Sequence, residues 1–150
     1  MTVQTTATGP LAGLRVLDIS TMLAGPYGAT LLGDLGADVI RVESHYGDES
    51  RHLGPQRGTE RGPYLSLNRN KRDIVIDLRQ EDSREVFARL VATADVLITN
   101  IREPALSKLG WNYAQVAALK ADSVWIGVTA FGPDGPYAGR PGIDFLAQGY

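Results

Sequence analysis

The stretch that decides the fold is LRVLDISTMLAGPYGATLLGDLGADVIRVE, residues 14–43. It begins with the short apolar run Leu14–Ser20, which is typical of a buried strand. A helix is predicted over Tyr27–Gly36, because Pro26 suits a first helical turn and a glycine suits a helix end. A second apolar run, Asp38–Glu43, predicts another strand. Strand, helix and strand in this order indicate a parallel βαβ unit.

The same alternation continues to the end of the chain. Leu31, Leu32 and Leu35 share one face of the first helix, as a core-facing stripe would. The polar segment Ser44–Pro63 is a long loop, and a loop of that length in a compact domain is usually functional or disordered. Beyond it we predict a strand at Asp73–Arg79, a helix at Ser83–Ala94, a strand at Asp95–Asn100, helices at Pro104–Gly110 and Tyr113–Lys120, and a strand at Ser123–Phe131. The pattern predicts an α/β fold with a doubly wound, mostly parallel sheet, formed by residues 11–150 after a flexible lead-in over 1–10.

Composition excludes several classes of protein. The 150 residues carry 15 Lys and Arg against 17 Asp and Glu, a net charge of −2, which argues against a nucleic-acid partner. No apolar run reaches membrane-spanning length, and the first ten residues lack the features of a signal peptide. The absence of cysteine excludes disulfides and thiol nucleophiles, and two histidines argue against a metal site. We therefore expect a cytoplasmic protein without a membrane partner.

The carboxyl ends of the strands are where ligands bind in such a fold. The first strand leads into the small-residue turn at 23–26, LAGP, whose backbone N–H groups could approach an anion. The alternative is that Ala24 and Gly25 only allow tight packing of helix on strand. The turn matches neither the G-x-G-x-x-G pattern nor a P-loop, which disfavours a nicotinamide-binding domain.

Basic residues cluster near these strand ends. Taken one at a time, each of these residues is interpreted as a solvated surface charge. They are Arg41, Arg69, Lys71, Arg72, Arg79, Arg102 and Lys108. Arg79, Arg102 and Lys108 follow consecutive strand ends, so we expect them to converge, as phosphate recognition requires. Asn100 ends a strand and offers both a donor and an acceptor.

The acids and histidines give weaker signals. Asp144 follows a glycine-rich loop and could serve as a nucleophile or base, or alternatively as a helix N-cap. Asp18 and Asp34 are interpreted as structural, and His45 and His52 as loop surface.

Four blocks in order make a family recognisable: residues 10–43, 67–79 (LNRNKRDIVIDLR), 94–110 (ADVLITNIREPALSKLG) and 127–150. Together they resemble the N-terminal portion of the class III CoA-transferase family, which includes formyl-CoA and carnitine CoA-transferases and the α-methylacyl-CoA racemases. The resemblance covers nearly the whole chain from Pro10 onward.

The resemblance implies a Rossmann-like large domain within an interlocked homodimer. It implies acyl-CoA and a carboxylic acid as substrates, no permanently bound cofactor, and transfer of CoA through an aspartyl-CoA thioester and a mixed anhydride. By position, the contacts to CoA would be Ala24, Leu78, Arg79, Asn100, Arg102 and Lys108, the last standing where relatives often have arginine. Asp144 would be an assisting acid near the active site.

Three departures from the family pattern matter. The nucleophilic aspartate of the family lies beyond Tyr150, so we expect residues 1–150 to be a truncated piece that is inactive alone. Leu23 stands where some transferases have glutamine. Ile143 stands where racemases carry a catalytic histidine, and because isoleucine cannot shuttle a proton, racemase chemistry is disfavoured. A non-catalytic CoA-binding module or subunit remains the third alternative.

Overall fold

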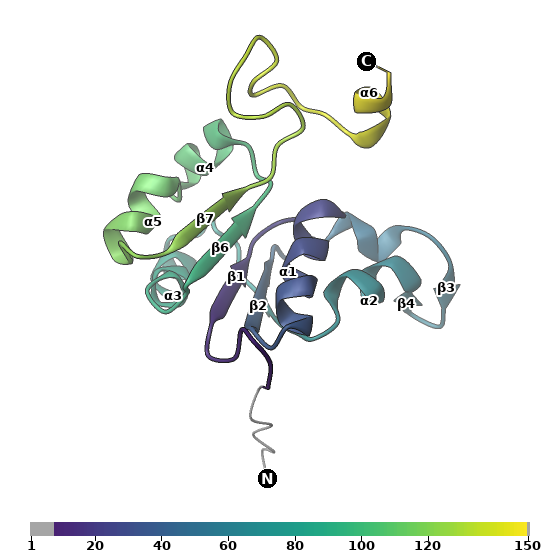
Figure 1. Cartoon of the computed structure of the whole chain (residues 1–150), viewed down its shortest axis with the longest axis horizontal. Helices are drawn as coiled ribbons and strands as arrows, with labels where there is room; N and C mark the ends of the chain where they lie inside the picture. The colour runs from purple at the N-terminus through teal and green to yellow at the C-terminus, as the bar shows by residue number, and fades with distance from the viewer. Residues whose placement is uncertain (1–7, 150) are drawn as a thin grey trace.

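The computed structural model describes residues 8–149, and Figure 1 shows the arrangement of its elements. The strands are β1 Arg15–Asp18, β2 Asp38–Glu43, β3 Gln56–Arg57, β4 Glu60–Arg61, β5 Lys71–Val75, β6 Val96–Thr99 and β7 Val124–Gly127. The helices are α1 Ala24–Asp34, α2 Gly62–Asn68, α3 Glu81–Val91, α4 Glu103–Leu109, α5 Tyr113–Leu119 and α6 Asp144–Gln148, with a 3-10 helix η1 at Glu49–His52.

Five of the strands form one parallel sheet in the order β5-β2-β1-β6-β7. The chain first winds from β1 outward to β2 and β5, then returns to the other side of β1 and continues through β6 and β7. This reversal confirms the predicted doubly wound α/β fold. It also places a topological switch point between β1 and β6, where the loops after neighbouring strands diverge and open a crevice.

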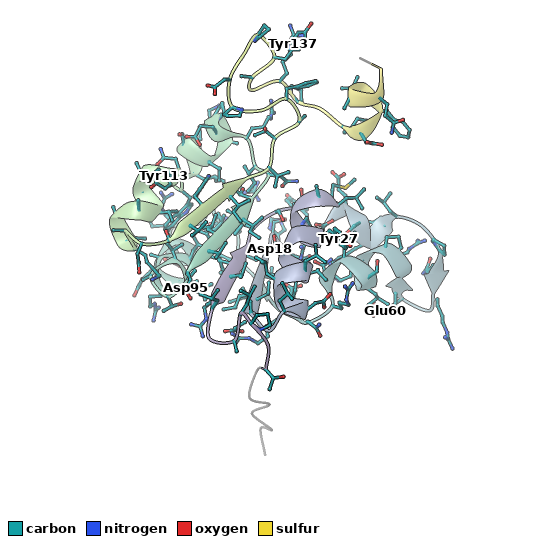
Figure 2. The ribbon with its side chains drawn as sticks, in the orientation of Figure 1. Asp18, Tyr27, Glu60, Asp95, Tyr113 and Tyr137 are labelled. Carbon is teal, nitrogen blue, oxygen red and sulfur yellow. The ribbon has the colours of Figure 1, made fainter. Side chains whose placement is uncertain are left out.

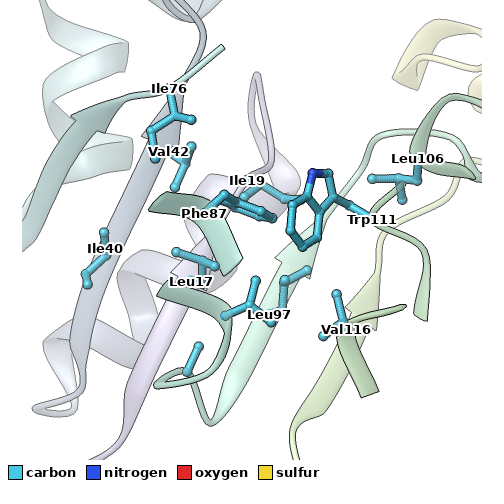
Figure 3. Close-up of a cluster of buried hydrophobic side chains, with 12 residues drawn as sticks. Leu17, Ile19, Ile40, Val42, Ile76, Phe87, Leu97, Leu106, Trp111 and Val116 are labelled. Carbon is cyan, nitrogen blue, oxygen red and sulfur yellow. The ribbon is translucent and has the colours of Figure 1, made fainter. Parts of the chain in front are cut away.

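The larger core lies on the face of the sheet that α3, α4 and α5 cover (Figure 1). Leu17 and Leu97 from the central strands meet Phe87 of α3 and Trp111, all of them buried (Figure 3). The Phe87 and Trp111 rings pack edge to face, with centroids 4.6 Å apart. Because α3 and the α4–α5 pair are amphipathic and short, this shared layer fixes both against the sheet.

The opposite face carries α1 and a smaller core of Val16, Ala29, Ala37, Val39 and Ile98. The expectation that Leu31, Leu32 and Leu35 form the buried stripe of this helix is wrong for two of the three. Only Leu32 packs on the core, whereas the other two are exposed.

The helix instead buries its small residues. A Cβ on Gly25 would lie 2.4 Å from the Ser20 side chain, so α1 approaches the sheet too closely for anything larger there. This close approach explains why small residues, rather than leucines, face the sheet. It supports the packing interpretation for Gly25, whereas Ala24 is exposed.

Several boundaries differ from the sequence prediction: α1 begins at Ala24 rather than Tyr27, and β7 spans Val124–Gly127 rather than Ser123–Phe131. Two further differences concern β5 and the segment 44–63. β5 spans Lys71–Val75 rather than Asp73–Arg79, because the strand begins where the Lys71 ammonium bonds inward to Asp18 and to the Pro26 carbonyl. The predicted loop at 44–63 contains η1 and the β3–β4 hairpin, and α2 begins at its end. No residue of α2 is fully buried, so its sequence lacks the apolar stripe from which an amphipathic helix is predicted.

Of the predicted lead-in, residues 1–7 lie outside the described part of the chain, as does Tyr150. After it, the Leu11 amide donates to the Leu35 carbonyl at 3.0 Å, which ties the start of the domain to the end of α1. Within residues 8–149, no helix is both long enough and apolar enough to cross a membrane.

The edge strand β7 exposes apolar side chains on its α1-side face, where Val124 is 54% and Ile126 is 38% exposed. An edge strand with an uncovered apolar face favours pairing with another chain. We expect the polypeptide 1–150 on its own to self-associate, and the double change Val124→Thr plus Ile126→Thr to reduce the association. Light scattering during size exclusion measures this, with Val86→Thr on α3 as the control; a monomeric 1–150 polypeptide would contradict the expectation.

Candidate functional site

A pocket of about 280 Å³ lies at the carboxyl ends of β1, β2 and β5, beside the loop that follows β6. This is the edge of the sheet at which the sequence predicts a ligand site. The pocket is lined by Ile19, Thr21, Arg41, Val42, Glu43, Ser44, Gly47, Asp48, Ile76, Asp77, Leu78, Arg79, Ile101 and Leu109.

The floor of the pocket is apolar and its rim is polar. Ile19, Val42 and Ile76 belong to the larger core and reach the pocket from below, while Leu78 and Ile101 pack against that core from the loops. A floor of this kind accepts a flat apolar group, and a charged rim can orient the polar part of the same ligand.

Arg79 stands on the rim, paired with Asp77. Its Nε donates to Asp77 Oδ1 and its Nη2 to Asp77 Oδ2, each at 2.8 Å, and its backbone N–H donates to the same carboxylate at 3.1 Å. The hydrogen bonds from Arg79 lower the pKa of Asp77. The guanidinium is more than half exposed, so it is held in place and remains open to an anion from solvent.

Arg41 is buried, with a side chain only 1% exposed, so its interpretation as a solvated charge is wrong. Its Nε donates to Glu43 at 2.8 Å, its Nη1 lies 3.4 Å from Asp18, and its Nη2 donates to Asp48. The physical reason is the parallel register, which sets Arg41 beside Asp18 on the neighbouring strand. Asp18 lies in the interior on the α1 side of the sheet (Figure 2), where a buried carboxylate requires a partner.

Lys71 was also expected at the surface, and its side chain is likewise buried. Its ammonium donates to Asp18 at 2.9 Å, to the Pro26 carbonyl at 2.8 Å and to Asn68 Oδ1 at 2.9 Å, which uses all three of its donors. Burial lowers the pKa of Lys71, and the charge of Asp18 opposes that effect. Lys71 thereby connects β1, α1 and α2 through Asp18, Pro26 and Asn68.

Glu43 connects this buried network to the surface. It accepts hydrogen bonds from Arg41, from Arg51 Nε at 2.9 Å and from the Tyr64 hydroxyl at 2.7 Å. Burial would raise the pKa of Glu43, but these hydrogen bonds outweigh it and lower the pKa to about 2. Burial and the charge of Glu43 raise the pKa of the neighbouring Asp73. Glu43 is therefore the stronger acid of the pair.

Asn100 bridges the loops after β1 and β6 at the switch point. Its Oδ1 accepts from the Thr21 N–H at 3.0 Å, and its Nδ2 donates to the Thr21 carbonyl at 2.8 Å. The side chain predicted to contact a ligand is therefore engaged with the backbone of the neighbouring loop.

Of the other residues predicted to contact CoA, some line the pocket and some do not. Leu78 and Arg79 line it, and Ala24 is exposed as the first residue of α1. Arg102 and Lys108 are exposed at the two ends of α4, and their chain neighbours Ile101 and Leu109 form part of the lining. Of the three basic residues expected to converge, Arg79 lines the pocket, whereas Arg102 and Lys108 lie at the ends of α4, each next to a lining residue.

Asp144 is the first residue of α6, which stands apart from the sheet at the end of the 128–143 segment (Figure 1). Ile143 is the N-cap of this helix, so the alternative of an Asp144 N-cap is wrong. Asp144 lies in the first turn, where the helix dipole favours a negative charge. His45 is about half exposed on a loop, with Nδ1 3.4 Å from Asp77 Oδ2, and His52 is exposed at the end of η1, which confirms that both lie at the surface.

Sequence reasoning missed Asp48, a buried acid that contacts two other segments of the chain. Besides Arg41, it accepts from the backbone N–H of Ser50 at 2.7 Å and of Met22 at 3.1 Å. The signal that could have found it is the charged Arg41 in the middle of the apolar run Asp38–Glu43, because a cation buried in a strand requires buried acids nearby.

Comparison with known proteins gives the following relatives. The chain is 38% identical to succinate–glutarate CoA-transferase of Agrobacterium fabrum over 148 residues, covering 93% of this chain and 37% of the relative. It is 41% identical to the beta subunit of succinyl-CoA–L-malate CoA-transferase of Chloroflexus aurantiacus, covering 96% and 36%. A crystal structure of a CAIB/BAIF family protein from Brucella suis superposes with a TM-score of 0.89 at 42% identity, covering 94% and 39%.

The chain therefore spans less than two fifths of the length of each of these relatives. The family model described as CoA-transferase family III matches residues 11–150, which is nearly the whole chain. With the doubly wound sheet and the four ordered sequence blocks, this match shows that the chain belongs to CoA-transferase family III.

Proposed function

We propose that the protein is an acyl-CoA:carboxylate CoA-transferase, and that residues 11–150 supply part of its coenzyme A site. The observation that carries the proposal is the pocket at the strand ends, which has Leu78 in its apolar lining and Arg79 on its rim. The two CoA-transferases among the relatives support the class of reaction.

The chemistry of the pocket fits the nucleotide end of coenzyme A. An apolar floor accepts a purine ring, and a guanidinium on the rim bonds phosphate oxygens in a forked geometry. Arg102 and Lys108, the chain neighbours of the lining residues Ile101 and Leu109, would add charge for the remaining phosphates. Ala24 would offer its backbone to the same ligand.

The reaction proposed is transfer through a carboxylate nucleophile, an aspartate outside residues 11–150. It attacks the thioester carbonyl, the C–S bond breaks, and CoA leaves as a thiolate while a mixed anhydride forms. The thiolate then attacks the aspartyl carbonyl, which releases the first carboxylate and leaves an aspartyl-CoA thioester. An acceptor carboxylate reverses both steps to give the new acyl-CoA. We assign Asp144 as an assisting acid, the assembly as an interlocked homodimer, and the location as the cytoplasm.

The direct test is calorimetric titration of the full-length protein with CoA and with succinyl-CoA. Binding below millimolar ligand is expected, and no heat at millimolar ligand would contradict the proposal. Mass spectrometry after trapping with hydroxylamine or borohydride should then detect the aspartyl adduct. Binding without turnover would instead support a non-catalytic CoA-binding subunit. The racemase alternative, which Ile143 disfavours, would be supported by exchange of the substrate α-proton with solvent deuterium in the absence of acceptor acid.

Loss of a cation from the nucleotide end should affect binding more than chemistry. We expect Arg79→Ala and Arg102→Ala each to raise the KM for acyl-CoA about tenfold, with a smaller fall in kcat, because phosphate contacts are equal in the ground and transition states. Steady-state kinetics of the full-length protein measure both parameters. Arg89→Ala on α3 is the control, an exposed arginine that does not line the pocket; an unchanged KM would remove the residue concerned from the CoA site.

A further inference from the structure

The turn between β1 and α1 contains a strained residue. Met22 has a φ of 69°, in the left-handed region that residues with a side chain rarely adopt. Such a conformation persists only where the surroundings fix it, and it recurs at ligand sites. The preceding residue, Thr21, lines the pocket, so the shape of this turn sets one wall of the site.

One clamp on the turn is the Asp48 carboxylate, which is buried. Its two oxygens lie 3.1 and 3.3 Å from the Met22 nitrogen and accept that N–H. Arg41 and the Ser50 N–H also donate hydrogen bonds to the same carboxylate. The acid is therefore fixed, and its contact with the turn is a backbone contact.

The second clamp is Asn100, which holds both polar groups of the Thr21 backbone at 3.0 and 2.8 Å. The two clamps come from segments that lie 26 and 79 residues away along the chain. Together they bond three consecutive polar groups of the turn, namely the N–H and carbonyl of Thr21 and the N–H of Met22.

We propose that Asp48 and Asn100 are positioning residues of the CoA-ester site, which act by holding the Thr21–Met22 turn in its left-handed shape. The identity of the ligand in this inference rests on the proposed function. The two clamps on the turn rest on the geometry alone. Asn100, expected from the family resemblance to contact CoA, acts in this view on the loop that contacts it.

The test compares Asp48→Asn with the same variant carrying Met22→Gly, in the full-length protein. Asp48→Asn should speed amide hydrogen exchange at Met22 at least tenfold and raise the KM for succinyl-CoA about tenfold. Adding Met22→Gly should return the KM to within threefold of wild type while the melting temperature stays lowered, because glycine adopts a φ of 69° without a clamp. A merely structural acid predicts no such rescue.

Three results would overturn the inference: an unchanged exchange rate at Met22 in Asp48→Asn, an unchanged KM in an otherwise active enzyme, or no rescue by Met22→Gly. If the wild-type protein neither binds nor converts succinyl-CoA, the proposed function fails. The exchange measurement then still decides the clamp, because faster exchange supports it and unchanged exchange overturns it.

Discussion

Arg41→Met should lower the free energy of unfolding by about 3–5 kcal/mol. The variant keeps most of the side-chain volume but leaves Asp18, Glu43 and Asp48 without the cation that they share in the interior. Charges removed from water are costly unless they are paired, and removing one partner leaves the desolvation of the others uncompensated. Urea titration followed through tryptophan fluorescence, to which the buried Trp111 contributes, measures the change.

The matched control is Arg72→Met on the adjacent strand β5. Arg72 also makes a forked pair, with Asp38 at 2.7 Å, but its side chain is 64% exposed. An exposed pair contributes about 0–1 kcal/mol, so this variant should lie close to wild type. Equal losses for the two variants would mean that the buried network contributes no more than a surface ion pair does.

Acid should weaken the fold through Glu43. Its pKa is about 2 in the folded protein and 4.5 when unperturbed, so between these values the unfolded state binds more protons than the folded state. Stability that is fully present above pH 4.5 is therefore lost as the pH falls toward 2. We expect a loss of about 3 kcal/mol from this group. Denaturant titrations across this pH range measure it.

Glu43→Gln is the diagnostic variant, since it should start less stable at neutral pH and lose less stability on acidification. Glu85→Gln is the control, because Glu85 is an exposed residue of α3 outside the network. If the Glu43→Gln protein and wild type lose stability in parallel from pH 4.5 downward, the acid sensitivity resides in other carboxylates.

The fold could be read from sequence because strand and helix signals alternate so regularly. Residues 14–43 form the predicted strand–helix–strand unit, with β1, α1 and β2 near their expected bounds. The miss at β5 has a tertiary cause: the apolar alternation continues to Leu78, but sheet pairing follows the contacts of the buried Lys71. Helix α2 was missed because it buries no residue fully, although the Gly62-Pro63 pair at its start is a helix N-terminus signal.

The site was predicted less completely than the fold. Strand-end logic identified Arg79, because parallel strands place their carboxyl ends at one edge, and the family resemblance added Leu78; both residues line the pocket. The same logic could not separate Arg41 from the surface cations, since only the register with β1 brings it beside Asp18. Asp48 had no signal of its own, because its partners are backbone groups and a cation from two other segments.

The strand order also governs how the site forms during protein synthesis. Arg15 at the start of β1 bonds Asp38, 23 residues later, on one side and Asp95, 80 residues later, on the other. At ribosomal speed, the stretch between those two partners takes roughly 3–11 s to emerge. Until β6 arrives, one edge of β1 has open N–H and carbonyl groups, and the Thr21 turn lacks Asn100. A nascent chain thus exposes its central strand for seconds, which is the interval in which a chaperone would have to act.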